Sequence, residues 1–330
     1  MDILHNLETF WSQSVAVGLS GWVILATAIL YAALYLLRDR NGSPVSWAAF
    51  RRYVFPRAIY AHRSARLDVP VFMLSIALGA VLLTPLLAIS TITAGWTSTT
   101  LSGLVGVREQ LPDGDWWPSI WLTLALFLIM DAGFFVSHRL QHKLHWLWEF
   151  HKVHHSAPVL NPLSAFRQHP VDQLVDGAFI GVATGITLGI FDYGYMGVAE
   201  PLTAMGYNLG VYVFYLAGAH LRHSHIWLGY PGWLSRLLIS PAQHQIHHST
   251  ERRHRDVNFG GIFALWDALT GTLYVPNRRE SFPIGLPQGE HPAYSSLVGL
   301  YVLPVYRAAA RFKRVFNRSR CLHKSASLTN

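Results

Sequence analysis

Length, composition and charge limit the classes of protein to which this chain can belong. Of its 330 residues, 51% are hydrophobic and only 13% carry a charge, whereas soluble domains carry about a quarter charged residues. The composition therefore favours a membrane protein. The single cysteine, Cys321, excludes an internal disulfide and a cysteine-rich metal site. The net charge of +8 accompanies no nucleic-acid-binding motif, so we attribute it to membrane topology and attraction to anionic lipid, and expect no nucleic-acid partner.

Four apolar regions follow one another along the chain. Residues 15–37 contain no charge and exceed the roughly 20 residues that a helix needs to span a bilayer. Residues 69–93 and 116–136 predict a second and a third span. Residues 177–219 are apolar and rich in glycine, but they are too long for one span and short for two. We therefore expect this fourth region to form a hairpin that does not fully cross the membrane.

Basic residues orient these spans. Residues 38–66 are strongly basic, whereas the Gly-, Thr- and Ser-rich loop that we expect at 95–115 carries one arginine against three acids. The positive-inside rule places 38–66 in the cytoplasm and 95–115 outside, so the third span returns to the cytoplasm near His138. We predict an all-α fold, a polytopic membrane helical bundle with a histidine-rich helical cap on its cytoplasmic side. A bacterial inner membrane and the endoplasmic reticulum fit equally well.

Histidine is concentrated in one part of the chain. Thirteen of the 18 histidines lie between residues 138 and 248, and most belong to three clusters, His138-x3-His142, His151-x2-His154-His155 and His244-x2-His247-His248. Residues three or four apart share one face of a helix, and imidazole is the commonest side-chain metal ligand. Each cluster can therefore aim two or three nitrogens at one point, which predicts a site for more than one metal ion. Imidazole suits iron, zinc and copper alike, so the ligand type does not identify the metal.

Asp131 precedes the two histidines of the first cluster by seven and eleven residues, which places all three roughly on one helical face. An ionisable residue in an apolar span is costly and usually functional. We predict that Asp131 orients a ligand histidine, a common arrangement in metal sites. The alternative is a helix-end residue that meets interfacial water.

Missing motifs exclude other classes of metalloenzyme. No cluster has a glutamate next to its first histidine, as the H-E-x-x-H motif of zinc metalloproteases requires. The clusters also lack the Glu-x-x-His motif of soluble di-iron bundles.

The remaining isolated histidines are expected at the surface, and they are His5, His62, His145, His254, His291 and His323.

From about residue 131 to residue 274, the chain resembles the fatty acid hydroxylase/sterol desaturase superfamily of integral-membrane, histidine-rich di-iron oxygenases. The resemblance rests on the three clusters in order and on the motifs around them. These motifs are Leu147-Trp148-Glu149-Phe150, Ser156, Phe166-Arg167-Gln168-His169-Pro170, Pro241, Ser249, Asn258-Phe259-Gly260, Leu265-Trp266-Asp267 and Gly271-Thr272. The segments before and after this range resemble the family only in kind.

The resemblance implies which residues bind metal. The eight cluster histidines are the expected ligands, namely His138, His142, His151, His154, His155, His244, His247 and His248. A further ligand stands between the second and third clusters, where His223 fits the family position best and His220 and His225 remain alternatives. His169 is expected as an additional ligand or as a neighbour that orients one.

The resemblance also implies residues around the metal. We place Asp131 and Asn258 in the catalytic machinery. Roles in orienting a ligand or binding the substrate headgroup are expected for Arg167, Asp256 and Asn258.

The implied activity is hydroxylation or desaturation of a lipid, a fatty acyl chain, a sterol or a related molecule, with O2 at two iron ions. Zinc would fill the same site without redox chemistry. No haem domain of the cytochrome b5 kind and no dinucleotide-binding G-x-G-x-x-G loop is recognisable. We therefore expect a separate electron donor, such as a reductase, a ferredoxin or a cytochrome b5-like carrier. Residues 191–215 are candidates for lining a lipid pocket, and the alternative is ordinary helix packing.

Three parts are expected along the chain. They are N-terminal transmembrane helices with a basic cytoplasmic loop (1–115), a catalytic domain (116–275) and a basic C-terminal tail (276–330). The alternative function is a membrane metal transporter or metal sensor. Transport would require ligands along the spanning helices, whereas these ligands follow the end of the third span, so the sequence favours the oxygenase.

Overall fold

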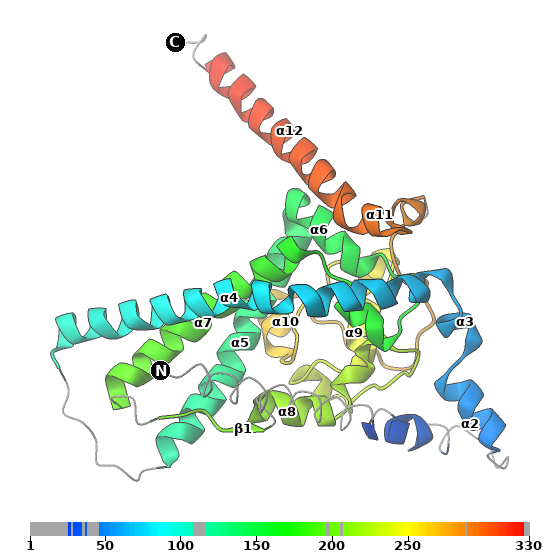
Figure 1. The fold of residues 1–330 in the computed structure, drawn as a ribbon, viewed down its shortest axis with the longest axis horizontal. Helices are drawn as coiled ribbons and strands as arrows, with labels where there is room; N and C mark the ends of the chain where they lie inside the picture. The colour runs from blue at the N-terminus through cyan, green and yellow to red at the C-terminus, as the bar shows by residue number, and fades with distance from the viewer. Residues whose placement is uncertain are drawn as a thin grey trace.

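A computed structural model describes most of the chain, namely residues 26–27, 29–34, 37, 46–107, 116–195, 199–204, 207–287 and 289–326. The described part is predominantly helical, as predicted (Figure 1). The predicted first span, residues 15–37, lies largely outside it. The elements in chain order are α2 (Trp47–Val54), α3 (Arg57–Tyr60), α4 (Arg63–Val105), α5 (Trp117–Lys143), α6 (His145–His155), η1 (Pro162–Phe166), α7 (Pro170–Tyr195), β1 (Thr203–Ala204), β2 (Tyr207–Asn208), α8 (Leu209–Leu216), η2 (Ala219–His223), η3 (Leu234–Arg236), α9 (Pro241–His247), η4 (Arg252–His254), α10 (Leu265–Thr270), η5 (His291–Tyr294), α11 (Leu297–Tyr301) and α12 (Leu303–Ala326).

Three long helices, α4, α5 and α7, form the body of the fold, and α7 packs against both of the others (Figure 1). Glycines allow their backbones to approach closely. A Cβ atom at Gly185 or at Gly189 of α7 would lie 2.5 Å from a carbonyl oxygen of α4, and one at Gly133 of α5 would lie 3.0 Å from a carbonyl oxygen of α7. Small residues at helix crossings favour association in a membrane, where burial of apolar surface contributes little.

Helix α4 is longer than the sequence suggested. The segment predicted as an external loop continues the helix as far as Val105, so the prediction was wrong for residues 95–105. Hydroxyl side chains fit inside this helix because each donates to a carbonyl oxygen one turn earlier. The bonds run from Thr97 to Thr93 (2.7 Å), from Thr100 to Trp96 (2.7 Å) and from Ser102 to Ser98 (2.9 Å).

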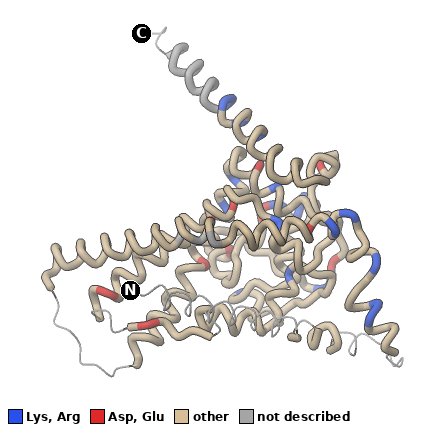
Figure 2. The backbone as a smooth tube through the Cα atoms, viewed as in Figure 1, with Lys and Arg blue, Asp and Glu red and all other residues tan. Residues whose placement is uncertain are grey.

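The long apolar helices and the charged residues are unevenly distributed over the three-helix body. Among the described residues, α5 and α7 are the two helices identified as long and apolar enough to cross a membrane. Figure 2 shows that lysines and arginines gather at the end of the long helices where α2, α3, α6 and the start of α12 lie. At the opposite end, the charged residues within the described ranges are two acids, Asp192 and Glu200.

The glycine-rich region 177–219 reverses the direction of the chain. Helix α7 ends at Tyr195, the antiparallel pair β1–β2 follows, and α8 then packs beside α5. Two hydrogen bonds fix this reversal to the first turns of α5, from Glu200 N to Ser119 Oγ (3.2 Å) and from Leu202 N to Thr123 Oγ1 (2.7 Å). Helix α7 begins at Pro170. The apolar pattern indicated a later start, because the first turns of this helix contain polar residues.

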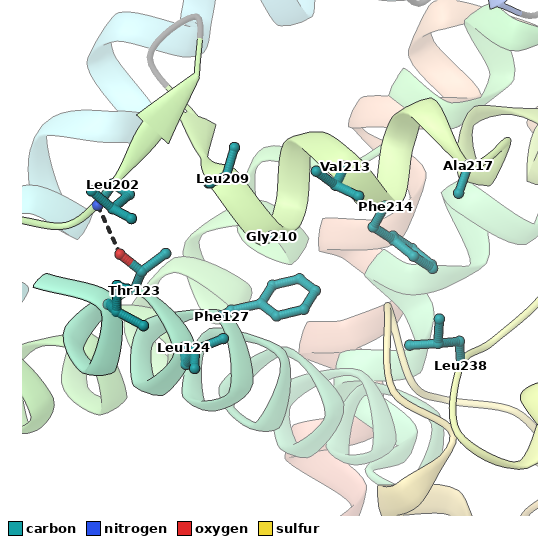
Figure 3. A pocket seen from close by; sticks show the side chains of 11 residues that line it. Thr123, Leu124, Phe127, Leu202, Leu209, Gly210, Val213, Phe214, Ala217 and Leu238 are labelled. Carbon is teal, nitrogen blue, oxygen red and sulfur yellow. Dashed lines mark hydrogen bonds between the residues drawn. The ribbon is translucent and has the colours of Figure 1, made fainter. Parts of the chain in front are cut away.

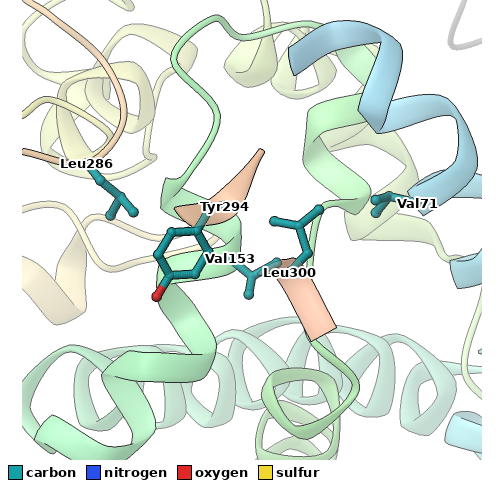
Figure 4. Close-up of a cluster of buried hydrophobic side chains, with 5 residues drawn as sticks. All are labelled: Val71, Val153, Leu286, Tyr294 and Leu300. Carbon is teal, nitrogen blue, oxygen red and sulfur yellow. The ribbon is translucent and has the colours of Figure 1, made fainter. Parts of the chain in front are cut away.

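The C-terminal segment is part of the core rather than a separate tail. Tyr294 and Leu300 lie in a buried apolar cluster with Val71 of α4, Val153 of α6 and Leu286 (Figure 4). From there α12 projects outward (Figure 1). Contacts therefore cross the boundary predicted after residue 275.

A buried ion pair fixes the start of α4 to the centre of the protein. Asp68 is fully buried and Arg167 is 1% exposed, and their closest N–O distance is 2.6 Å. The guanidinium also donates to Ser64 and to Ser156, and Asn161 donates to Asp68 at 2.6 Å. Arg167 is thus buried and bonded within the protein, so the headgroup role predicted for it was wrong. Removal of one partner of such a buried pair leaves an uncompensated charge.

Close packing of α7 on α4 leads to a prediction. We expect Gly185→Leu to lower the free energy of unfolding by about 1–3 kcal/mol or more, the range typical of overpacking, because its Cβ atom would overlap the α4 backbone. Denaturant titration of the purified protein in detergent measures the change. Gly194→Ala is the matched control, since a Cβ atom there meets nothing within 4 Å. Equal stability of the two variants would contradict the packing described.

Candidate metal centre

The histidine clusters lie on helices that converge on one region. His138 and His142 are in the last turns of α5, the second cluster forms the second half of α6, and the third occupies α9 and its C-cap. Helix α9 begins with Pro241 after a capping box, in which Ser240 and Gln243 satisfy each other's backbone N–H groups. The 3-10 helix η2 contributes His223. The first cluster thus lies at the end of a long helix, and short helices present the other two.

Nine histidines form two groups. Group 1 consists of His138, His142, His151, His155 and His247, and group 2 consists of His154, His223, His244 and His248. Within each group, one ring nitrogen from every member lies within 4.8 Å of those of all other members. Eight of the nine are buried and His142 is partly buried. Neither group contains an acidic residue.

Each histidine doublet is divided between the two groups. Residues four apart share a helical face, so His151 and His155 both point to group 1, and His244 and His248 both point to group 2. The residue next to each pair is rotated by about 100° on the helix. His154 therefore joins group 2 and His247 joins group 1. The groups are adjacent, because the ring centroids of His155 and His248 lie 4.5 Å apart.

In group 1, hydrogen bonds indicate which ring nitrogens carry a proton. His138 Nδ1 lies 2.7 Å from the Phe259 carbonyl oxygen, and His151 Nδ1 lies 3.0 Å from a carboxylate oxygen of Asp172. A carbonyl and an ionised carboxylate only accept, so each Nδ1 donates and each Nε2 of the neutral rings presents a lone pair. The two Nε2 atoms nevertheless lie 3.1 Å apart. Two lone pairs at this distance repel, and a shared cation would remove the repulsion.

Group 2 shows the same arrangement. Ser164 donates its hydroxyl hydrogen to the Asn161 carbonyl oxygen (2.7 Å), so its Oγ accepts from His223 Nδ1 (3.0 Å). His223 Nε2 is then unprotonated, and it lies 3.0 Å from His244 Nε2, which lies 3.1 Å from His248 Nε2. Three Nε2 atoms thus converge.

These distances and charges fit a bound metal ion. Two imidazole nitrogens at ~2.1 Å from one ion and at right angles lie ~3.0 Å apart, which matches the N–N distances above. Burial lowers the pKa of His151 to about 3 and that of His247 to about 4, so both are neutral ligands at physiological pH. Burial also lowers the pKa of the other members outside α5, which are His154, His155, His223, His244 and His248. Among the described residues, the Nε2 atoms of His142, His155 and His247 have no hydrogen-bond partner.

Two acidic residues of α7 support the centre, and neither was predicted from the sequence. Asp172, which is 1% exposed, contacts His151 Nδ1 with both oxygens, at 3.0 and 3.2 Å. Asp176 accepts from Ser137 (2.5 Å) and from Gln141 (2.8 Å), which ties α7 to the histidine-bearing turns of α5. Their spacing of four residues at the start of an apolar helix was the available signal.

Asp131 acts on a loop and not on a histidine. Its carboxylate accepts from the backbone N–H groups of Ile262 and Phe263, both at 2.8 Å, and from the Trp266 indole at 3.0 Å. The predicted direct contact with a ligand is therefore wrong. The loop that Asp131 holds carries the Phe259 carbonyl oxygen, the partner of His138. Asp267 holds the same loop through the N–H groups of Phe259 and Gly260.

Two other predicted site residues lie outside both groups. Asn258 is fully buried with a positive φ of 56°, donates to the Gln243 carbonyl oxygen and accepts from Tyr274 N. These bonds hold the backbone on which α9 rests and contact no histidine. His169 has both nitrogens engaged, Nδ1 as acceptor from Val171 N and Nε2 at 3.1 Å from the Tyr301 carbonyl oxygen. It is therefore no candidate ligand in this arrangement.

The remaining histidines and Asp256 are also placed. His220 and His225 contact backbone carbonyl oxygens, those of Tyr215 and Tyr53, so His223 alone of the three alternatives joins a group. Asp256 lies 3.6 Å from His142 Nδ1 and binds Lys143 at 2.6 Å. His62 and His145 are exposed as predicted, whereas His254 is 1% exposed, so that prediction was wrong. His5 and the side chain of His323 lie outside the described residues.

A polar cleft of about 470 Å³ gives access to group 1. It is lined by His142, His155 and His247 together with charged residues, which include Lys152, Glu251, Arg255, Asp256, Glu290 and Arg311. None of the nine histidines lines the apolar pocket of about 490 Å³ between α5 and α8 (Figure 3). Part of region 191–215, predicted to line a lipid pocket, does line this one through Leu209, Gly210 and Val213.

Comparison with known proteins identifies the part of the chain that carries this centre. Residues 123–272 match the sequence profile of the fatty acid hydroxylase family. This part of the chain belongs to that family. All nine grouped histidines lie within residues 123–272. Eight belong to the clusters of α5, α6 and α9, and the ninth is His223 of η2.

Relatives are found across several named activities of this family. They include alkylglycerol monooxygenase of Danio rerio, 27% identical over 54% of this chain and 36% of that protein. Ornithine lipid hydroxylase OlsE of Rhizobium tropici is 29% identical over 52% of this chain and 47% of its own length. Human cholesterol 25-hydroxylase is 30% identical over 46% and 50%. The chain therefore spans half or less of the length of each of these relatives, and no solved structure matches it.

The stability of the metal-free protein should depend on pH. The pKa of His151 and of His247 is lowered by burial from 6.5 to about 3 and about 4. The unfolded chain therefore takes up protons just below pH 6.5, while the folded chain does not until about pH 4. The free energy of unfolding is expected to fall as the pH falls through this window, and to be full above it. Denaturant titration at a series of pH values measures the slope, which His247→Gln should reduce; a flat profile would contradict buried neutral imidazoles.

Asp172 should matter for metal affinity. Asp172→Asn removes the carboxyl group that contacts His151 Nδ1, and loss of such a partner costs roughly 10–100-fold in metal affinity. Competition with a chelator measures the dissociation constant. Asp192→Asn on the same helix is the control, because its carboxylate accepts from Ser98, away from the histidines. Equal affinities in the two variants would exclude the orienting role.

Proposed function

We propose that this protein is a membrane-bound lipid oxygenase that holds two iron ions, one in each histidine group, and hydroxylates or desaturates a lipid with O2. The observation that carries the proposal is the pair of adjacent all-histidine groups in a fatty acid hydroxylase domain. Bound iron would supply O2 activation for oxidation of a C–H bond, with electrons from a separate donor protein. The division of each histidine doublet between the two groups supports two metal positions.

The residues of the chain prepare this site in three ways. Burial keeps the imidazoles neutral, so that they bind metal without first losing a proton. Asp172, Phe259 and Ser164 fix the outer ring nitrogens, and thereby direct the Nε2 atoms of His151, His138 and His223 inward. The polar cleft admits water, protons and the polar part of a substrate to group 1.

A lipid is the proposed substrate class. The named relatives are a hydroxylase of an ornithine lipid, a monooxygenase of alkylglycerol and a hydroxylase of cholesterol, which share an apolar body and a polar group. The mixed charges of the cleft beside group 1 suit the polar end of such a molecule. The long uncharged helices suit residence in a membrane.

The cytoplasmic side is the proposed location of the centre. Helices α6 and α9, which carry the second and third histidine clusters, lie at the same end of the long helices as the lysines and arginines of α2, α3 and α6 (Figures 1 and 2). Basic residues mark the cytoplasmic side of membrane proteins. Both groups are confined to this end of the long helices, whereas a metal transporter would need ligands along its spanning helices.

Removal of a ligand tests the proposal. His154→Ala in group 2 and His247→Ala in group 1 should each abolish lipid oxidation, a loss beyond the roughly 10–100-fold that the loss of an outer partner causes. Each variant should also hold less iron while still inserting into the membrane. His220→Ala is the control and should retain iron and turnover, since His220 contacts the Tyr215 carbonyl oxygen instead.

The assay is consumption of O2 that requires both a reductant and added lipid, followed by mass spectrometry of the lipid. A gain of one oxygen identifies hydroxylation and a loss of two hydrogens identifies desaturation. Full turnover in either ligand variant would refute the assignment.

A further inference from the structure

His254 occupies a buried position between two hollows of the protein surface. It lines the polar cleft beside group 1, although only 1% of it is exposed. Glu280 lies on its other side and lines a second polar pocket of about 620 Å³ with Arg253 and Tyr274. None of the nine grouped histidines lines this outer pocket. His254 therefore separates the outer pocket from the cleft that reaches the metal centre.

The two nitrogens of His254 face opposite partners. Nδ1 makes a hydrogen bond of 2.9 Å with Ser249 Oγ. Nε2 lies 3.3 Å from a carboxylate oxygen of Glu280, and among the described residues neither of these two atoms has a hydrogen-bond partner. The rings of Tyr274 and Phe282 pack edge-on against the imidazole, with centroid distances of 5.1 and 5.2 Å. Two aromatic rings thus flank the imidazole, which has one nitrogen toward each hollow.

Ser249 completes the connection to the cleft. It lines the same cleft as His155 and His247. Its Oγ accepts from Glu251 N at 3.1 Å. A hydroxyl group both donates and accepts, so Ser249 can receive a proton from His254 while releasing its own into the cleft, and it remains neutral throughout.

The charged groups around His254 oppose one another. Burial and the neighbouring Arg253 lower the pKa of His254, whereas Glu280 and Glu251 raise it. Glu280 also contacts Arg253 at 2.9 Å and accepts from the Tyr274 hydroxyl at 2.9 Å, and Glu251 lies 3.9 Å from Nδ1. The ring is therefore neutral at rest and has a carboxylate beside it that stabilises a transient positive charge.

We propose that Glu280, His254 and Ser249 form a proton relay from the outer pocket to the cleft at group 1. The inference rests on the proposed oxygenase function, because hydroxylation consumes protons: substrate–H, O2, two electrons and two protons give substrate–OH and water. The separate donor supplies the electrons, and water in the outer pocket supplies the protons.

Each transfer conserves protons along the chain of groups. Water in the outer pocket first protonates Glu280, which gives this proton to His254 Nε2. His254 Nδ1 gives its proton to Ser249 Oγ, and the Ser249 hydroxyl releases its own proton into the cleft, so one proton enters and one leaves. Reorientation of the imidazole then turns its protonated nitrogen toward Ser249 again.

The first test is turnover and its rescue. His254→Ala should lower the rate of lipid hydroxylation by about 100-fold, within the range for loss of a general acid, with unchanged iron content. Added imidazoles should restore the rate to a degree that depends on their pKa, since they would carry the proton. Arg278→Gln is the control, because Arg278 lines the outer pocket without contacting His254.

Rescue that is independent of the pKa of the added imidazole, or loss of iron from His254→Ala, would assign a structural role and overturn the relay. Equal turnover in His254→Ala and in the active wild-type protein would overturn the relay alone. A wild-type protein that oxidises no lipid would instead contradict the proposed function.

A second measurement does not depend on turnover. In the zinc-loaded protein in detergent micelles, NMR follows the titration of the His254 ring, assigned with His254→Gln. Glu280→Gln should lower the pKa of His254, because it removes the carboxylate that raises it. An unchanged titration would show that the two groups are not coupled, and would overturn the relay.

Discussion

The hydrogen bond that a histidine makes on the side facing away from the centre is the interaction on which the whole arrangement depends. Burial lowers the pKa of the grouped histidines of α6, η2 and α9 and so favours their neutral form, but neutrality alone leaves open which nitrogen bears the proton. The protonated nitrogen is fixed for three rings by a partner from a different part of the chain. These partners are Asp172 for His151, Ser164 for His223 and the Phe259 carbonyl oxygen for His138. The inward lone pairs are therefore a product of tertiary structure, although the histidines themselves are grouped in the sequence.

The loop 258–263 shows how far this support extends. Asp131 and Asp267 bind its backbone N–H groups, and Gly261 passes so near Asp131 that a Cβ atom would lie 2.7 Å from its carboxylate. Carboxylates that accept several N–H bonds hold a backbone in one position. The loop in turn places one carbonyl oxygen against His138. The ion pair between Asp68 and Arg167 performs the same task for the start of α4 and the end of α6.

The sequence was sufficient to predict the metal centre where metal-binding side chains recur at helical spacing. Spacings of three and four residues predicted that the clusters bind metal together, and the structure brings eight cluster histidines and His223 into two groups. It was insufficient where a side chain's partner is distant in the chain. Asp131 shares a helical face with two histidines yet binds a loop more than 130 residues later, and His169 fits a family motif while both its nitrogens contact the backbone. Residues 95–105 are helical, with hydroxyl groups that donate to carbonyl oxygens of the same helix, and composition does not reveal such bonds.

The divided doublets mean that the two groups cannot be adjusted independently. His154 and His155 are joined by one peptide bond, as are His247 and His248, yet each pair serves both groups. A rotation of α6 or α9 that improves one position necessarily displaces a ligand of the other. Helix α6 is further fixed at Glu149, which binds Arg311 of α12 and Lys152. The spacing between the two positions is therefore set by the covalent geometry of the backbone, the least deformable element that a protein has.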